Sequence, residues 1–127
     1  FEGGDGTSNQ QAAYSQLTEA QEFYNSGADV TAPLLALNHG TTGINAIVMG
    51  DIYRGSAYPT EYYGDIFFND LGQGIVRNVS LDAAGNVTSV DTFDTGANVV
   101  VMIQQGPDGL LYYVDLDDGE VGRWIFE

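Results

Sequence analysis

The chain has 127 residues, 43% of them hydrophobic, and this length is sufficient for one domain with a buried core. Eighteen acidic residues against three arginines and no lysine give a formal net charge of -15, which disfavours binding to nucleic acid or to an anionic membrane surface. No run of residues approaches the roughly 20 apolar positions of a membrane-spanning helix, so membrane insertion is not expected. The lack of cysteine excludes disulfides and thiolate chemistry.

The first part of the chain, residues 1–33, differs in composition from the rest. Residues 1–10 are rich in glycine and in polar side chains, which is typical of a loop. The stretch from Asn9 to Tyr24 is rich in Gln, Ala and Glu, and its apolar positions recur at helical spacing. We therefore predict that residues 1–33 form a loop and a short surface helix inserted before the main domain.

From Leu34 onward the pattern is that of short β-strands. Runs of Val, Ile and aromatic residues alternate with turn sequences rich in Gly, Asp and Asn. Strands separated by turns every 8 to 12 residues predict an all-β fold, which is a sandwich, a barrel or a set of propeller blades. The predicted strands are Ile44–Val48, Ile66–Asn69, Ile75–Leu81, Thr88–Phe93, Val99–Gln104, Leu110–Asp115 and Val121–Phe126.

An internal repeat favours the propeller among these folds. Residues 64–82 and 109–127 align without a gap at an offset of 45 residues. A repeated strand–turn–strand unit at this offset is typical of four-stranded propeller blades, whereas a sandwich has no reason to repeat in this way. The identical positions are Gly64, Asp70, Leu71, Gly74 and Val76, which match Gly109, Asp115, Leu116, Gly119 and Val121.

The repeat predicts about two blades within residues 34–127. The first blade is expected over about residues 44–96, and the second over about residues 97–127, where the chain ends after three strands. Two blades cannot close a ring, and their open edges must therefore be covered. We expect the remaining blades of a larger propeller, or other subunits, to complete the β structure, so that the chain is never a free monomer.

Two motifs of the β region are specific when they are taken together: Tyr53-Arg54-Gly55, and Gly106-Pro107-Asp108-Gly109 followed by Leu-Leu-Tyr-Tyr. The same pattern is followed by His39, by the Tyr62-Tyr63-Gly64 segment and by residues 67–70 and 79–85. With these motifs, about residues 33–127 resemble the propellers of the glucose/sorbosone dehydrogenase-like family, the quinone-dependent sugar dehydrogenases.

The resemblance implies a six-bladed propeller exported to the periplasm or outside the cell. In active members of that family, pyrroloquinoline quinone (PQQ) and calcium lie on the central channel, and the catalytic histidine base belongs to an earlier blade. The resemblance therefore implies no catalytic residue in this chain. The family's basic contacts to the quinone fall near Gly72, Val99 and Val101, which carry no positive charge. Because a desolvated tricarboxylate needs cations or donors, we expect PQQ only in an intact parent protein.

Four residues are candidates for ligand binding. His39, the single histidine, could be a channel-facing ligand or base, or a hydrogen-bonded anchor of the loop before Ile44. Arg54 lies among aromatic residues that include Tyr53 and Tyr58, and a planar guanidinium in this setting could face a sugar ring or a carboxylate. The alternative for Arg54 is structural: it would stack on its neighbours and pair with an aspartate such as Asp51 or Asp65.

The acidic turn at the end of the repeat is a candidate calcium site. Asp115, Asp117, Asp118 and Glu120 resemble part of a calcium-binding loop, but they lack the complete spacing of acidic ligands. The alternative is a plain hairpin turn that ends in Asp-Gly.

The sequence thus favours a structural or interaction module: a propeller fragment of an exported protein that resembles sugar dehydrogenases and has no catalytic activity by itself. One alternative is a part of a PQQ-dependent dehydrogenase whose catalytic residues lie in other blades. A second alternative is a carbohydrate- or calcium-binding module.

Overall fold

The computed structural model describes residues 16–27, 29 and 31–126. The chain divides into two compact units, Phe1–Leu34 and Leu35–Glu127. The first unit contains the helix α2 (Thr18–Asn25), so the predicted surface helix is present over its C-terminal half, while residues 9–15 lie outside the described part. Within the described residues, no helix is both long enough and apolar enough to cross a bilayer.

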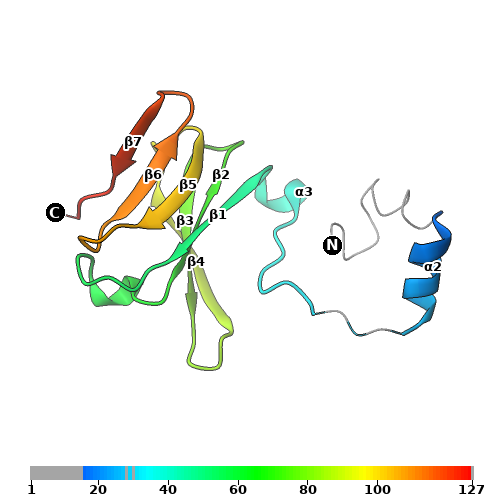
Figure 1. The fold of residues 1–127 in the computed structure, drawn as a ribbon. Helices are drawn as coiled ribbons and strands as arrows, with labels where there is room; N and C mark the ends of the chain where they lie inside the picture. The colour runs from blue at the N-terminus through cyan, green and yellow to red at the C-terminus, as the bar shows by residue number, and fades with distance from the viewer. Residues whose placement is uncertain (1–15, 28, 30, 127) are drawn as a thin grey trace. The chain divides into compact units, whose positions relative to one another are not determined.

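The second unit consists of two antiparallel sheets, in which the strands lie side by side in chain order (Figure 1). Two short helical turns, α3 (His39–Thr42) and η1 (Thr60–Tyr62), accompany them. This all-β architecture of partial propeller blades confirms the predicted fold class. The first sheet contains β1 (Ile47–Ile52), β2 (Ile66–Asp70), β3 (Ile75–Leu81) and β4 (Val87–Asp94), and the second contains β5 (Val100–Gln105), β6 (Leu111–Asp115) and β7 (Glu120–Arg123).

The sequence repeat corresponds to two equivalent hairpins in different sheets. In the β2–β3 hairpin Asp70 pairs with Ile75 and Asn69 with Val76. In the β6–β7 hairpin Asp115 pairs with Glu120 and Val114 with Val121, so each pair is reproduced 45 residues later. The prediction that residues 64–82 and 109–127 are matching hairpins of neighbouring blades is therefore confirmed.

The glycines of the repeat are explained by backbone conformation. Gly64 and Gly74 have φ angles of 94° and 62°, and their counterparts Gly109 and Gly119 have φ angles of 81° and 66°. This left-handed region disfavours residues with a Cβ atom, so glycine is the natural residue at all four positions. The same turn geometry thus recurs in both blades because the same residue permits it.

Two strands differ from the prediction by more than one residue at an end. The first strand was expected over Ile44–Val48, but β1 spans Ile47–Ile52. The segment before β1 is held by a side chain instead of a strand partner, because the N–H groups of Asn45 and Ala46 donate to the carboxylate of Asp70. The last strand, expected to reach Phe126, ends at Arg123.

The core lies between the two sheets, which pack face to face through β1 and β5. Gly50 on β1 permits this approach, since a Cβ atom there would come within 2.6 Å of the Ile103 Cβ atom on β5. Phe67 and Val76 of the first sheet and Val100 of the second are fully buried in this layer. The Asn69 side chain, also buried, donates to the Val100 carbonyl at 2.9 Å and joins the sheets directly.

The two repeated aspartates stabilise the turns after β2 and β6. The Oδ1 atom of Asp115 accepts hydrogen bonds from the N–H groups of Asp117 and Asp118, within its own turn. The Oδ1 atom of Asp70 accepts from Gly72 in its own turn and, in addition, from the two residues that precede β1. The same residue thus closes one hairpin in the second sheet, and a hairpin plus a neighbouring segment in the first.

Candidate functional site

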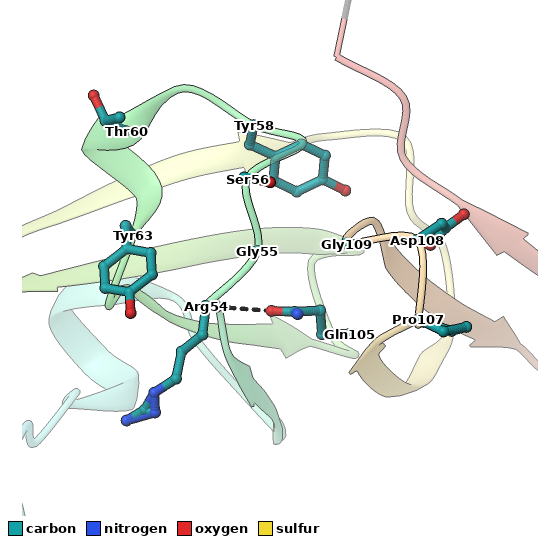
Figure 2. A pocket seen from close by; sticks show the side chains of 10 residues that line it. All are labelled: Arg54, Gly55, Ser56, Tyr58, Thr60, Tyr63, Gln105, Pro107, Asp108 and Gly109. Atoms are coloured by element: carbon teal, nitrogen blue, oxygen red, sulfur yellow. Dashed lines mark hydrogen bonds between the residues drawn. The ribbon is translucent and has the colours of Figure 1, made fainter.

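A pocket of about 470 Å³ opens between the loop that follows β1 and the turn that joins β5 to β6 (Figure 2). The turn contributes residues 107–109, together with Gln105 from the end of β5. The loop contributes six residues to the wall: Arg54, Gly55, Ser56, Tyr58, Thr60 and Tyr63. These two segments carry the Tyr-Arg-Gly and Gly-Pro-Asp-Gly motifs. The motifs are about 50 residues apart in the sequence and form one site in the structure.

Two tyrosines fix the loop to the second sheet. The rings of Tyr53 and Tyr58 stack with centroids 4.7 Å apart, and the Tyr53 hydroxyl accepts a hydrogen bond from the Tyr58 N–H. The Tyr58 hydroxyl accepts from the Leu111 N–H at 2.8 Å and donates to the Trp124 carbonyl at 3.0 Å. Burial raises the pKa of Tyr58, although the Leu111 N–H acts in the opposite direction, so this hydroxyl stays protonated and functions as a brace.

Gly55 explains why the loop can lie so close to the β5–β6 turn. A Cβ atom at this position would come within 2.6 Å of the Gly109 carbonyl oxygen and 2.7 Å of the Tyr53 hydroxyl. Any larger residue would push the two walls of the pocket apart. Gly55 is therefore required by the packing of the pocket walls, and its presence does not indicate which ligand the pocket binds.

Arg54 is held by its backbone, while its side chain has no partner. Its N–H donates to Oε1 of Gln105 at 2.7 Å. Within residues 16–27, 29 and 31–126, no hydrogen bond, ion pair or ring contact involves the Arg54 guanidinium. The pairing considered for Arg54 is absent there: Asp51 accepts from Ile52 and Gln105 N–H groups, and Asp65 accepts from the side chains of Asn78 and Ser80.

The other two arginines each have a partner, although the Nη1 atom of Arg77 is buried without one in the described residues. Arg123 forms a salt bridge of 3.0 Å with Asp108, and Arg77 donates to the Gln73 side chain at 2.6 Å. The Tyr112 hydroxyl also donates to Asp108, and this bond, with a smaller contribution from Arg123, lowers the pKa of the Asp108 carboxyl. The carboxylate of Asp108 on the pocket wall therefore already has partners, in contrast to the guanidinium of Arg54.

Three hydroxyl groups and one amide complete the polar lining. Ser56, Thr60 and Tyr63 are exposed, and Tyr63 has 63% of its surface accessible to solvent. No hydrogen bond to these hydroxyls, or from the Gln105 amide nitrogen, occurs within the part of the chain that the structure describes. Figure 2 shows the Arg54 side chain and the Tyr63 hydroxyl directed to the same side of the pocket, away from Pro107 and Asp108.

The structure brings together some of the predicted ligand-binding residues. Arg54 and Tyr58 line the pocket, and Tyr53 lies directly behind Tyr58 in the core. His39 is exposed at the start of α3 and does not line the pocket. The contributions of Gln105 and Thr60 were not predicted, because only the contact between two distant loops brings them to the site.

The acidic turn does not present its carboxylates as one group. Asp115 is buried and binds the turn backbone, and Asp118 accepts a hydrogen bond from the Asn98 side chain. Within the described residues, no set of three or more His, Asp or Glu side chains is arranged to hold a metal ion. Calcium binding by Asp115, Asp117, Asp118 and Glu120 stays a prediction.

Comparison with known proteins gives a likeness of structure. No family model matches the chain, and no curated protein matches its sequence. Two solved structures resemble it, one described as "glucose dehydrogenase" and one as "Crystal structure of glucose dehydrogenase"; each superposes with a TM-score of 0.53 and 22% identity, over 62% and 63% of this chain. Over that stretch the fold is glucose-dehydrogenase-like. The chain spans about a quarter of the length of these proteins, 24% and 23%.

The glucose-dehydrogenase-like fold raises the question of whether these blades suit a quinone cofactor. The positions expected to contact it lie in the β2–β3 turn (Gly72) and at the start of β5 (Val99 and Val101), and none carries a cation. Arg77 of the first sheet is engaged by Gln73. These residues do not fit a tricarboxylate group.

Proposed function

We propose that this chain is a structural and interaction module, which supplies two adjacent blades to a larger propeller and has no catalytic activity by itself. The observation that carries the proposal is a difference in solvent exposure between equivalent positions of the two sheets. On one side of the repeated hairpin, the first sheet is covered by the second sheet. The equivalent side of the second sheet is open to solvent. Two pairs of residues make this comparison directly.

The first pair is Val76 and Val121, which are identical in the repeat. Val76 is 0% exposed because the second sheet covers its face, whereas Val121 is 71% exposed. On that same open face Val121 pairs with Val114, and Val114 pairs with Met102, which is 47% exposed. The second sheet therefore exposes a row of apolar side chains at the positions where the first sheet packs against its neighbour.

The second pair is Ile103 and Met49, which occupy the same place on the opposite face. Ile103 pairs with Tyr113 and is 4% exposed, since it packs against the first sheet. Met49 pairs with Phe68, the counterpart of Tyr113 in the repeat, and is 62% exposed. Phe68 itself is 2% exposed, so on this side the first sheet is open at β1 but covered at β2.

The proposed occupants of both open faces are further blades of the same kind. Adjacent blades of a propeller pack through the same two faces around the ring, as the two sheets do here. The similar glucose dehydrogenase structures are about four times as long as the segment that matches, which is consistent with additional blades. Among the described strands, β7 forms the outer edge of the second sheet (Figure 1), where a fourth strand would pair with its backbone groups.

Sedimentation of the purified 127-residue chain tests the proposal. At micromolar concentration we expect association, because the open faces expose apolar side chains to water. Replacing Val121 by Lys should shift the chain toward monomer, while Ala83→Lys, with the same change of charge in the exposed β3–β4 turn, should leave association unchanged. A stable wild-type monomer that unfolds cooperatively would contradict the proposal.

The fold also supports a second candidate, in which the parent protein is a quinone-dependent sugar dehydrogenase and other blades carry the catalytic residues. The discriminating assay supplies PQQ, calcium, glucose and a reducible dye to the chain alone. We expect neither stoichiometric quinone binding nor dye reduction, because Gly72, Val99 and Val101 offer no cation. Stoichiometric binding by the isolated chain would favour the dehydrogenase instead.

A further inference from the structure

The guanidinium of Arg54 is an exposed charged group without a partner within the described residues. The chain contains eighteen acidic residues and three arginines, so a partner for every arginine is easily available. Arg123 forms a salt bridge with Asp108 and Arg77 donates to the Gln73 amide oxygen, whereas no bond or ion pair of the Arg54 side chain occurs within the described ranges. The Arg54 backbone, fixed through Gln105, gives the loop its anchor without help from the side chain.

The groups around Arg54 share its lack of partners. The Tyr63 ring is largely exposed, and the hydroxyls of Ser56 and Thr60 and the amide nitrogen of Gln105 line the same pocket. These groups offer an aromatic surface and several donors and acceptors, as small-molecule sites do. At about 470 Å³, the pocket is large enough for one or two sugar rings.

The charges of the pocket select the kind of ligand. A guanidinium binds a carboxylate through two parallel hydrogen bonds, which makes a carboxylate its best complement. The second charged group of the pocket wall, Asp108, is negative and already paired with Arg123. A ligand with one carboxylate therefore suits the pocket better than a doubly charged phosphate, because the pocket has a single guanidinium to balance its charge.

We propose that the Arg54 pocket binds an acidic sugar, a monosaccharide that carries one carboxylate. The carboxylate pairs with the Arg54 guanidinium, and a face of the sugar ring lies against Tyr63. Hydroxyl groups of the sugar bond to Ser56 and the Gln105 amide. This site lies at the ends of β1 and β5, in the loop that follows β1, and does not involve Gly72 or Val99, the positions expected to contact a quinone.

The experiment compares three probes on the complete 127-residue chain: D-glucuronate, D-glucose and inorganic phosphate. Isothermal titration gives the affinities, and saturation-transfer NMR, observed on the ligand, works equally well if the chain associates. We expect glucuronate to bind at least roughly tenfold more tightly than glucose or phosphate, because it alone matches the single guanidinium. Equal affinity for glucose would show that Arg54 contributes nothing, and tighter binding of phosphate would show a simple anion site; either result overturns the proposal.

Variants of the pocket residues test whether glucuronate binds at Arg54. Arg54→Met should weaken glucuronate binding roughly tenfold, and Arg54→Lys should restore only part of it, because an ammonium group lacks the two-bond geometry. Ala83→Glu makes the same change in net charge in an exposed turn that does not line the pocket, and should leave the affinity unaltered. Tyr63→Phe should retain binding, whereas Tyr63→Ala should weaken it. Unchanged affinity in Arg54→Met, or an equal loss in Ala83→Glu, would refute the assignment.

Discussion

The two sheets contain the same hairpin in different surroundings. β2 and β3 lie in the middle of a four-stranded sheet, and four of the five residues of β2 are buried. β6 and β7 have the same register, but β7 is the edge of its sheet, and three of its four residues are exposed. The local sequence thus sets the shape of the hairpin, while the neighbouring strands and sheets decide how much of it is protected from water.

The repeated aspartates show the same difference in electrostatic terms. Burial alone would raise the pKa of Asp70, but the N–H groups of Ala46, Asn45 and Gly72 more than compensate, and the pKa lies below its ordinary value. The Oδ2 atom of Asp70 is buried with no partner within the described residues. Asp115 accepts hydrogen bonds from two N–H groups, both in its own turn. The Asp70 carboxylate therefore stabilises its own turn and the segment before β1, whereas the equivalent Asp115 carboxylate stabilises its own turn.

The largest effect that separates the two hairpins is expected from these aspartates. Asp70→Ala leaves three N–H groups without their acceptor, and it should lower the free energy of unfolding by about 3 kcal/mol. Asp115→Ala affects a single turn and should lower it by about half as much. Urea denaturation followed by circular dichroism measures both values. Equal losses would mean that the contacts to the segment before β1 contribute nothing to stability.

A smaller effect should distinguish Val76 from Val121. Val76→Ala removes two methyl groups from a fully buried site, and should reduce the free energy of unfolding by about 2 kcal/mol. Val121→Ala, at the equivalent exposed position, should change it by less than about 0.5 kcal/mol in the monomeric chain. The same denaturation experiment, run at a concentration where the chain does not associate, provides the comparison. A large loss for Val121 would show that its face is already covered.

The smallest of these effects is the dependence of stability on pH. Because the pKa of Asp70 is lower in the folded chain than in the unfolded one, its contribution is complete above about pH 4 and is lost as the pH falls through the folded value. Wild-type stability should therefore decline below about pH 4. Asp70→Asn should decline less over this range, since it removes the titrating group while keeping an acceptor oxygen. Parallel curves for the two proteins would contradict this account of Asp70.

Much of the architecture follows from the sequence alone. Alternating apolar residues and Gly-containing turns predict the strands, because strand periodicity and positive φ angles are properties of a few adjacent residues. The 45-residue repeat predicts two matching hairpins for the same reason. The boundary of β1 could not be predicted in this way, since the N–H groups of Asn45 and Ala46 bind a side chain 25 and 24 residues further along, respectively.

The pocket depends on contacts that no local pattern contains. The sequence identified Arg54 and Tyr58 as candidates, but it could not place Gln105 beside them or show that Asp51 and Asp65 bind other groups. The sequence also could not show that Val76 is buried and Val121 is exposed, because the two residues are identical in the repeat. Only the packing of one sheet on the other covers the first and leaves the second open, because burial is a property of the neighbours that the tertiary structure supplies.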